Sequence, residues 1–171
     1  PQSILVLLRE INRRLGLTIV LITHEMAVIR EICDRVAVLE GGRVVEEGPV
    51  WRVFGAPSHP ATQALLRPLV RDLPAELAAR LSAAPPAPGE TVLRLRYRGE
   101  GVGDPPLGRL AEALGASLRL LHGTVDRIQD HPQGFLIVAA DLPIADREAR
   151  LARARALTDH LEVLGDVAAI G

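Results

Sequence analysis

Residues Leu17–Met26 read LTIVLITHEM, and this stretch decides how the first part of the chain folds. Leu17 to Ile22 form a continuous apolar run, which is typical of a strand covered on both faces. A strand that leaves a core usually ends in Gly, Asn, Asp or Pro, but here Thr23, His24 and Glu25 follow. Open parallel sheets place their chemistry at the carboxyl ends of their strands, so His24 is a candidate functional residue.

The segments around this stretch are short, and Gly and Pro residues separate them. We expect the following elements: a helix that ends at Gly16, a helix over 25–32, a hairpin that turns at Gly41-Gly42 between strands 35–40 and 43–48, and two short helices at 51–54 and 62–69. These elements cannot cover one another's apolar faces, and a strand buried on both sides needs parallel neighbours. Residues 1–69 are therefore interpreted as the incomplete C-terminal part of a larger α/β domain.

Residues 70–89 have a different composition. A short helix from about Ala75 to Leu81 leads into the Pro-rich run 83–89, which favours an extended, semi-rigid linker.

Residues 90–171 read as a second domain of α+β class. The expected elements are a strand in which Leu93, Leu95 and Tyr97 alternate with Arg94, Arg96 and Arg98, a helix over 107–114, a strand over 117–128, a turn at 130–134, a strand over 135–140, a helix over 146–161 and a strand over 163–170. The order β-α-β-β-α-β is the ferredoxin-like pattern. Such a domain packs both helices on one sheet face and leaves the other face bare for a second copy or a ligand.

The composition narrows the classes of function. With 20 basic and 21 acidic residues the net charge is −1, which does not suggest the basic face of a nucleic-acid-binding protein. Cys33 is the only cysteine, so no internal disulfide can form, and we interpret this residue as a small buried hydrophobe in a reducing compartment. No apolar run approaches the roughly 18 residues of a membrane span. The histidines other than His24 are scattered without ligand spacing, so no metal site is expected.

The run SILVLLREINRRLGLTIVLITHEMAVIREICDRVAVLEGGRVVEEG, residues 3–48, resembles the C-terminal portion of bacterial ABC-transporter ATPase subunits, and more specifically the methionine-importer type. In that family a strand ending in Thr-His-Glu is the switch loop, whose His reaches the γ-phosphate and helps to hold the attacking water. The resemblance thus implies that His24 is the catalytic switch histidine. The alternative is that His24 only caps the helix that follows it.

Residues 90–171 resemble the NIL domain, the regulatory module of that importer's ATPase, on three segments: Gly101–Leu107, Leu120–Val125 and the turn into Gly134-Phe135. NIL domains are similar to ACT domains, which are ferredoxin-like, dimeric through their sheets and bind small amino acids. The resemblance implies a regulatory site for methionine or a related amino acid, for which the candidate residues are Ser117, Arg119, Leu121 and His122. Arg119 stands where a methionine-binding relative has a small polar group, and its alternative interpretation is a solvent-facing strand arginine.

The motifs that the sequence lacks limit what the chain can do alone. There is no GxxxxGK[ST] phosphate loop and no Lys at all, and the signature motif and the acidic strand end that holds magnesium are also missing. We therefore expect no ATP hydrolysis by this chain alone. ATP and Mg²⁺ belong to the complete subunit, and no cofactor is expected for this chain.

Three functions follow from these observations. The first is the distal part of the ATP-hydrolysing subunit of a D/L-methionine importer, with a C-terminal domain that senses the internal amino acid and inhibits transport. It would lie on the inner face of the cell membrane. Its expected partners are a permease, the N-terminal ATPase half and a second copy, and no nucleic acid. The second is a free-standing ACT-like module for ligand binding or dimerisation, from a truncated gene, without ATPase activity. The third, a small enzyme using His24 with Glu25, lacks any visible substrate pocket.

Overall fold

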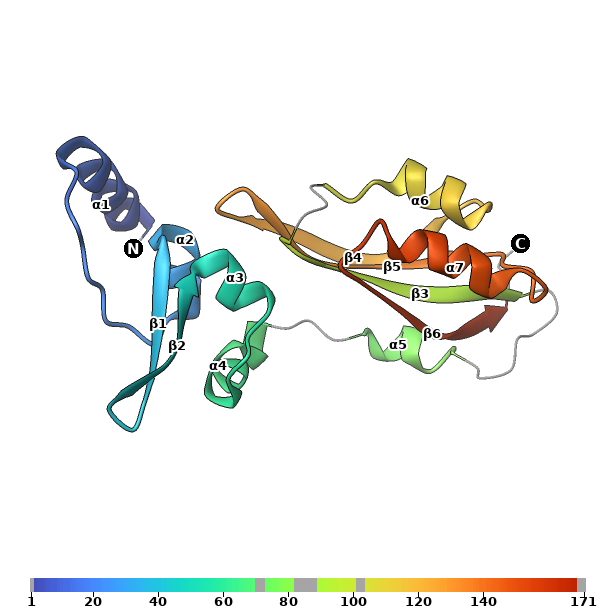
Figure 1. Ribbon diagram of the computed structural model, residues 1–171, viewed down its shortest axis with the longest axis horizontal. Helices are drawn as coiled ribbons and strands as arrows, with labels where there is room; N and C mark the ends of the chain where they lie inside the picture. The colour runs from blue at the N-terminus through green and yellow to red at the C-terminus, as the bar shows by residue number, and fades with distance from the viewer. Residues whose placement is uncertain (1, 70–72, 82–88, 101–103, 169–171) are drawn as a thin grey trace. The chain divides into compact units, whose positions relative to one another are not determined.

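The protein is described by a computed structural model that covers residues 2–69, 73–81, 89–100 and 104–168. The chain divides into two compact units, residues 1–69 and residues 70–171, and each is described by itself (Figure 1). The elements of unit 1 are α1 (Gln2–Leu15), α2 (Met26–Ile32), β1 (Arg35–Glu40), β2 (Arg43–Pro49), α3 (Val50–Gly55), α4 (Pro60–Leu66) and the 3₁₀ turn η1 (Arg67–Leu69).

The hairpin of β1 and β2 organises unit 1. Its two turn residues, Gly41 and Gly42, have φ angles of 55° and 77°, a left-handed geometry that matches the twist of the flanking strands and suits glycine. The predicted two-residue hairpin is therefore confirmed. Helix α3 follows β2 directly and contributes Val50 and Val53, which are buried.

The strand predicted over Leu17–Ile22 is wrong. The described backbone from Leu17 to Thr23 has no regular secondary structure, and Val20 and Ile22 are 85% and 94% exposed. A strand exists only when its backbone groups pair with a neighbour, and the described part of unit 1 offers a single hairpin whose two strands pair with each other. The apolar run is strand-like in composition but has no partner to pair with here.

Unit 2 contains a four-stranded sheet with helices on both faces. Its elements are α5 (Ala75–Ala78), β3 (Gly89–Arg98), α6 (Leu107–Leu114), β4 (Arg119–Ile128), β5 (His131–Ala140), α7 (Arg147–Arg155) and β6 (His160–Ala168). The strand order is β4-β5-β3-β6, and every neighbouring pair is antiparallel. This topology confirms the α+β ferredoxin-like prediction.

The main core lies between the sheet and the helices α6 and α7, which cover the same sheet face (Figure 1). The alternation read in the sequence is the cause, because Leu93, Leu95 and Tyr97 of β3 point to this face and are 3% exposed or less. Leu110 and Leu114 of α6 complete the contact from the helical side, together with residues of α7.

Three boundaries differ from the predictions. The turn between β4 and β5 is made by Gln129 and Asp130, both with positive φ, so Pro132 lies in a strand. Helix α7 ends at Arg155 instead of extending to Leu161, and β6 begins at His160. The interval from 156 to 159 contains Thr158, whose hydroxyl donates to the Arg96 carbonyl at 2.9 Å and so joins the loop to the edge of β3.

The opposite face of the sheet, expected to be bare, is covered in part. A second apolar cluster on this face consists of Val92, Ile137, Ala139 and Val167. Three leucines around helix α5, Leu73, Leu77 and Leu81, pack against it. Figure 1 shows α5 on the side of the sheet opposite to α6 and α7.

Candidate functional site

His24 lies in a bend immediately before helix α2, and its side chain is exposed. The backbone N–H of Glu25 donates to the hydroxyl of Thr23 at 3.0 Å, which forms a tight turn around His24. The residue at the N-cap position of α2 is Glu25, and that cap lacks a side-chain hydrogen bond. His24 therefore does not cap the helix, and the turn presents its imidazole outward.

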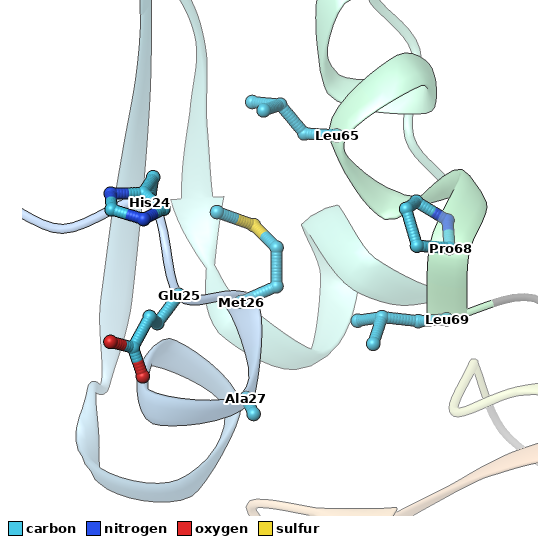
Figure 2. A pocket seen from close by; sticks show the side chains of 7 residues that line it. All are labelled: His24, Glu25, Met26, Ala27, Leu65, Pro68 and Leu69. Carbon is cyan, nitrogen blue, oxygen red and sulfur yellow. The ribbon is translucent and has the colours of Figure 1, made fainter.

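A shallow hollow of about 310 Å³ lies beside His24 within unit 1. One wall is the start of α2, with His24, Glu25, Met26 and Ala27, and the other is the α4–η1 segment, with Leu65, Pro68 and Leu69 (Figure 2). The Met26 side chain points into the space between His24 and the facing wall (Figure 2). The hollow thus has one polar side with a titratable ring and one apolar side.

Glu46 fixes the chain segment that leads to the second wall. Its carboxylate accepts hydrogen bonds from the Ser58 backbone N–H at 2.9 Å, the Ser58 hydroxyl at 2.9 Å and the His59 backbone N–H at 3.0 Å. His59 in turn caps α4, because its Nδ1 accepts from the Ala61 N–H at 3.2 Å, and Pro60 occupies the first turn. We call the segment Pro57–Pro60 with its Glu46 contact the α4 clamp.

The hydrogen bonds change the acidity of Glu46. Burial by itself raises the pKa of this carboxyl, but the backbone N–H of Ser58, the nearby hydroxyl of Thr62, the N–H of His59 and the Ser58 hydroxyl together lower the pKa to about 2. The Thr62 hydroxyl lowers the pKa of Glu46 because its dipole lies close to the carboxylate. It is buried and makes no hydrogen bond of ordinary geometry among the described residues. Glu46 is consequently a charged, structural carboxylate that positions α4.

The second candidate site lies on the sheet of unit 2. Arg119 is opposite Ala139 in the register of β4 and β5, and His122 is opposite Ile137. Ala139 and Ile137 belong to the apolar cluster on the face that α5 covers, so Arg119 and His122 share that face. We call this face of the sheet, which lies opposite to α6 and α7 and is covered only in part by α5, the open face.

Arg119 is already paired. Its guanidinium contacts both carboxylate oxygens of Glu90 on β3, one of them through Nε at 3.5 Å. The side chain of Glu90 is 17% exposed and that of Arg119 36% exposed, so the pair is partly shielded from water. The interpretation of Arg119 as a solvent-facing strand residue therefore misses its partner, which no local pattern in the sequence indicates.

Leu121, His122 and Gly123 surround an irregularity in β4. The register shifts between Leu120 and His122, and Leu121 joins the apolar cluster of the open face. The His122 ring lies 5.8 Å from the Phe135 ring. A Cβ on Gly123 would come within 2.6 Å of Leu136 Cδ2 and 2.9 Å of the Phe135 carbonyl oxygen, so the close backbone approach at this point of β4 requires glycine.

The remaining candidates are less closely placed. Ser117 precedes β4 and is exposed. Residues 101–103, part of the segment Gly101–Leu107 that carries the resemblance to the NIL domain, lie outside the described residues. Among the residues that the structure does describe, no group of three His, Cys, Asp or Glu side chains could hold a metal ion. Across those same ranges no helix has the length and apolarity needed to cross a membrane.

Comparison with known proteins bears on both sites. Residues 91–163 match the model of the NIL domain family. The chain is 55% identical over 181 aligned residues to the protein named Methionine import ATP-binding protein MetN 2 of Burkholderia pseudomallei (strain K96243), with 97% of this chain and 46% of that protein covered. The protein of the same name from Paraburkholderia xenovorans (strain LB400) is 52% identical over 179 residues with the same coverage. The chain spans about half the length of the curated relatives it matches.

Proposed function

We propose that this chain works as the C-terminal part of the ATP-binding subunit of a methionine importer. The premise is that residues 91–163 match the NIL domain family and that 97% of the chain aligns with a methionine import ATP-binding protein. The observation that carries the proposal is that a single alignment runs through both units, so the His24 turn and the NIL domain are matched in the same relatives. The activity, substrate and partners of those relatives are transferred to this chain as part of the proposal.

In this function His24 is the group that meets the terminal phosphate of ATP. The imidazole is exposed, makes no hydrogen bond among the described residues and stands beside a hollow, so it is free to accept such a contact. When bound, ATP with Mg²⁺ supplies the phosphoryl group whose hydrolysis drives transport. Phosphoryl transfer depends mainly on positioning and on charge stabilisation, and a ring nitrogen held on a short turn can position a water or a phosphate oxygen. The lysine of a phosphate loop must come from elsewhere, since this sequence has none.

The partners follow from this role. The N-terminal half of the ATPase supplies the phosphate loop, and a membrane permease holds the subunit at the cytoplasmic face of the cell membrane. The open face of the NIL domain pairs with a second copy and takes methionine or a related amino acid, which inhibits transport. Leu121 and His122 are the proposed contacts, and Ser117, which precedes the same strand, is a further candidate. Arg119, which is paired with Glu90, lies on the same face of the sheet.

Reconstitution of ATP hydrolysis tests the proposal. The chain is co-expressed with an N-terminal half that contains the phosphate loop of a relative, and phosphate release is measured for the wild type and for His24→Ala. We expect hydrolysis from the pair, loss of hydrolysis in His24→Ala, and no loss in the control His160→Ala, which changes an exposed histidine of unit 2. Equal hydrolysis by the wild type and His24→Ala would remove His24 from the mechanism.

A second function is favoured by one observation. Unit 2 has apolar clusters on both faces of its sheet, so it has a core of its own. A free-standing ligand-binding or dimerisation module is the corresponding proposal. Titration calorimetry with L-methionine, combined with the reconstitution of ATP hydrolysis, distinguishes the two functions. A free-standing module binds methionine, but the chain co-expressed with an N-terminal ATPase half does not hydrolyse ATP.

A further inference from the structure

Unit 2 carries its own cover on the face where the ligand is proposed to bind. Leu73, Leu77 and Leu81 recur every four residues, so a helical turn places them on one side, and all three pack on the apolar cluster of the open face. We call residues 73–81 the cover. Its helix, Ala75–Ala78, is four residues long, and five backbone hydrogen bonds join residues between Pro74 and Leu81, among them Ala79 N–H to the Ala75 carbonyl at 2.9 Å.

The cover owes its helical form to this contact. A helix this short is unstable in water, because its first hydrogen bonds fix several dihedral angles and few further bonds follow to offset that entropy loss. The exposed side of the turn carries Ala75, Glu76 and Ala78, which add no packing. The three leucines are thus the groups that stabilise it, and a loss of contact with the sheet unfolds it.

The cover and the candidate ligand residues share one surface. Leu121 packs against the same cluster of Val92, Ile137, Ala139 and Val167 as the leucines of the cover. His122 is opposite Ile137 in the sheet register. We propose that the cover and an amino acid bound at Leu121 and His122 exclude each other, so that ligand binding releases residues 73–81 from the open face.

This exclusion rests on the proposed function, which supplies the amino-acid ligand. A ligand that binds only the uncovered form shifts this equilibrium, which is the energetic requirement for a sensor.

Hydrogen exchange on the full chain tests the release directly. Amide protection is measured by mass spectrometry with and without saturating L-methionine. We expect protection of Ala78 to Leu81 in the free protein and its loss when methionine is added. Persistent protection of this segment in a protein that demonstrably binds methionine would overturn the proposal and leave the proposed function intact.

Titration calorimetry of two variants tests the competition. Leu77→Ser with Leu81→Ser weakens the cover, and we expect methionine affinity to increase about tenfold because the binding-competent fraction rises. Ile144→Ser is the matched control, since this apolar side chain is 77% exposed between β5 and α7 and does not belong to the cluster of the open face. If the double variant fails to fold, Ala78→Gly weakens the same turn from its exposed side.

The outcomes separate the two proposals. A cover variant that binds methionine more tightly than both the wild type and the Ile144→Ser control supports the exclusion. Equal affinity in the wild type and a folded cover variant refutes the exclusion alone. Absence of methionine binding in both the wild type and the folded cover variant refutes the exclusion and the ligand assignment together.

Discussion

Replacing Glu46 with Gln tests whether the α4 clamp holds the wall of the hollow beside His24. The Glu46 carboxylate accepts three hydrogen bonds from Ser58 and His59 at 2.9 to 3.0 Å. Glutamine keeps one acceptor oxygen and the approximate shape, but it removes the charge and offers N–H groups where the second oxygen accepted. The substitution therefore weakens the clamp without creating a large cavity.

The magnitude follows from the number of bonds. A hydrogen bond to a charged group contributes about 1.5–3 kcal/mol and a neutral one about 0.5–1.5 kcal/mol, so the loss is about 1 kcal/mol for each of the three bonds. Glu46 is only partly buried, and solvent screening reduces this sum. We expect Glu46→Gln to lower the free energy of unfolding of unit 1 by about 2 kcal/mol.

The pH dependence provides the second signature. The pKa of Glu46 falls from an ordinary value of 4.5 to about 2 in the folded protein. A lowered folded-state pKa contributes stability that is present above pH 4.5 and is lost as the pH falls from 4.5 towards 2. The wild type should therefore lose stability over this interval more steeply than Glu46→Gln, whose side chain does not titrate.

Trp51 makes the assay specific to unit 1. It is the only tryptophan in the chain and lies in α3, so its fluorescence in a urea titration follows this unit. Glu47→Gln is the control, because the neighbouring Glu47 makes an exposed ion pair with Arg35 at 3.3 Å, which contributes little. Equal stability losses for Glu46→Gln and Glu47→Gln, or parallel pH curves for the wild type and Glu46→Gln, would refute the clamp.

Two further predictions concern unit 2. Gly123→Ala should destabilise the protein by about 2 kcal/mol in thermal unfolding, since its Cβ would clash with Leu136 and the Phe135 carbonyl. Gly108→Ala is the control and should be neutral or stabilising, because a Cβ at Gly108 meets nothing within 4 Å. Equal effects of the two substitutions would disprove the close approach at β4. Tyr97→Phe should stabilise the protein by about 1 kcal/mol, because the Tyr97 hydroxyl is buried and makes no hydrogen bond of ordinary geometry among the described residues. Burial outweighs the nearby Thr158 hydroxyl and raises the pKa of Tyr97 to about 12. A clear loss of stability in Tyr97→Phe would mean that the hydroxyl has a partner in solution.

Predictions that rested on local chemistry were the accurate ones. The turn at Gly41-Gly42 and the helix over 107–114 are both encoded within a few residues. In each case the backbone geometry demands a particular residue type, and a neighbour many residues away does not alter that demand.

The errors arose where a distant neighbour decides the outcome. The run Leu17–Ile22 has strand composition, yet strand geometry requires a pairing partner. Pro132 was interpreted as a turn residue, but β5 accommodates it at its start, opposite Arg127 of β4 and before the pairing with β3 begins at Gln133. Periodicity reports which side of a segment is apolar, and it does not report what pairs with that segment.

The candidate site shows the same division. His24 could be found because a polar triplet at the end of an apolar run is a local anomaly. The Glu90 partner of Arg119 lies 29 residues away along the chain, and no pattern joins the two. The leucines of the cover had a visible spacing of four, but only the fold reveals that their apolar side rests on the open face.

The two units therefore call for different experiments. In unit 1 the apolar run beside His24 is exposed, so the proposed contact of the imidazole with a phosphate is best tested when a surface that pairs with this run is present. In unit 2 both sheet faces already carry apolar clusters, so ligand binding and release of the cover can be measured on this chain. If release occurs but hydrolysis is not reconstituted, the sensing half of the proposal stands without the ATPase half, because the contacts that hold the cover on the sheet lie within unit 2.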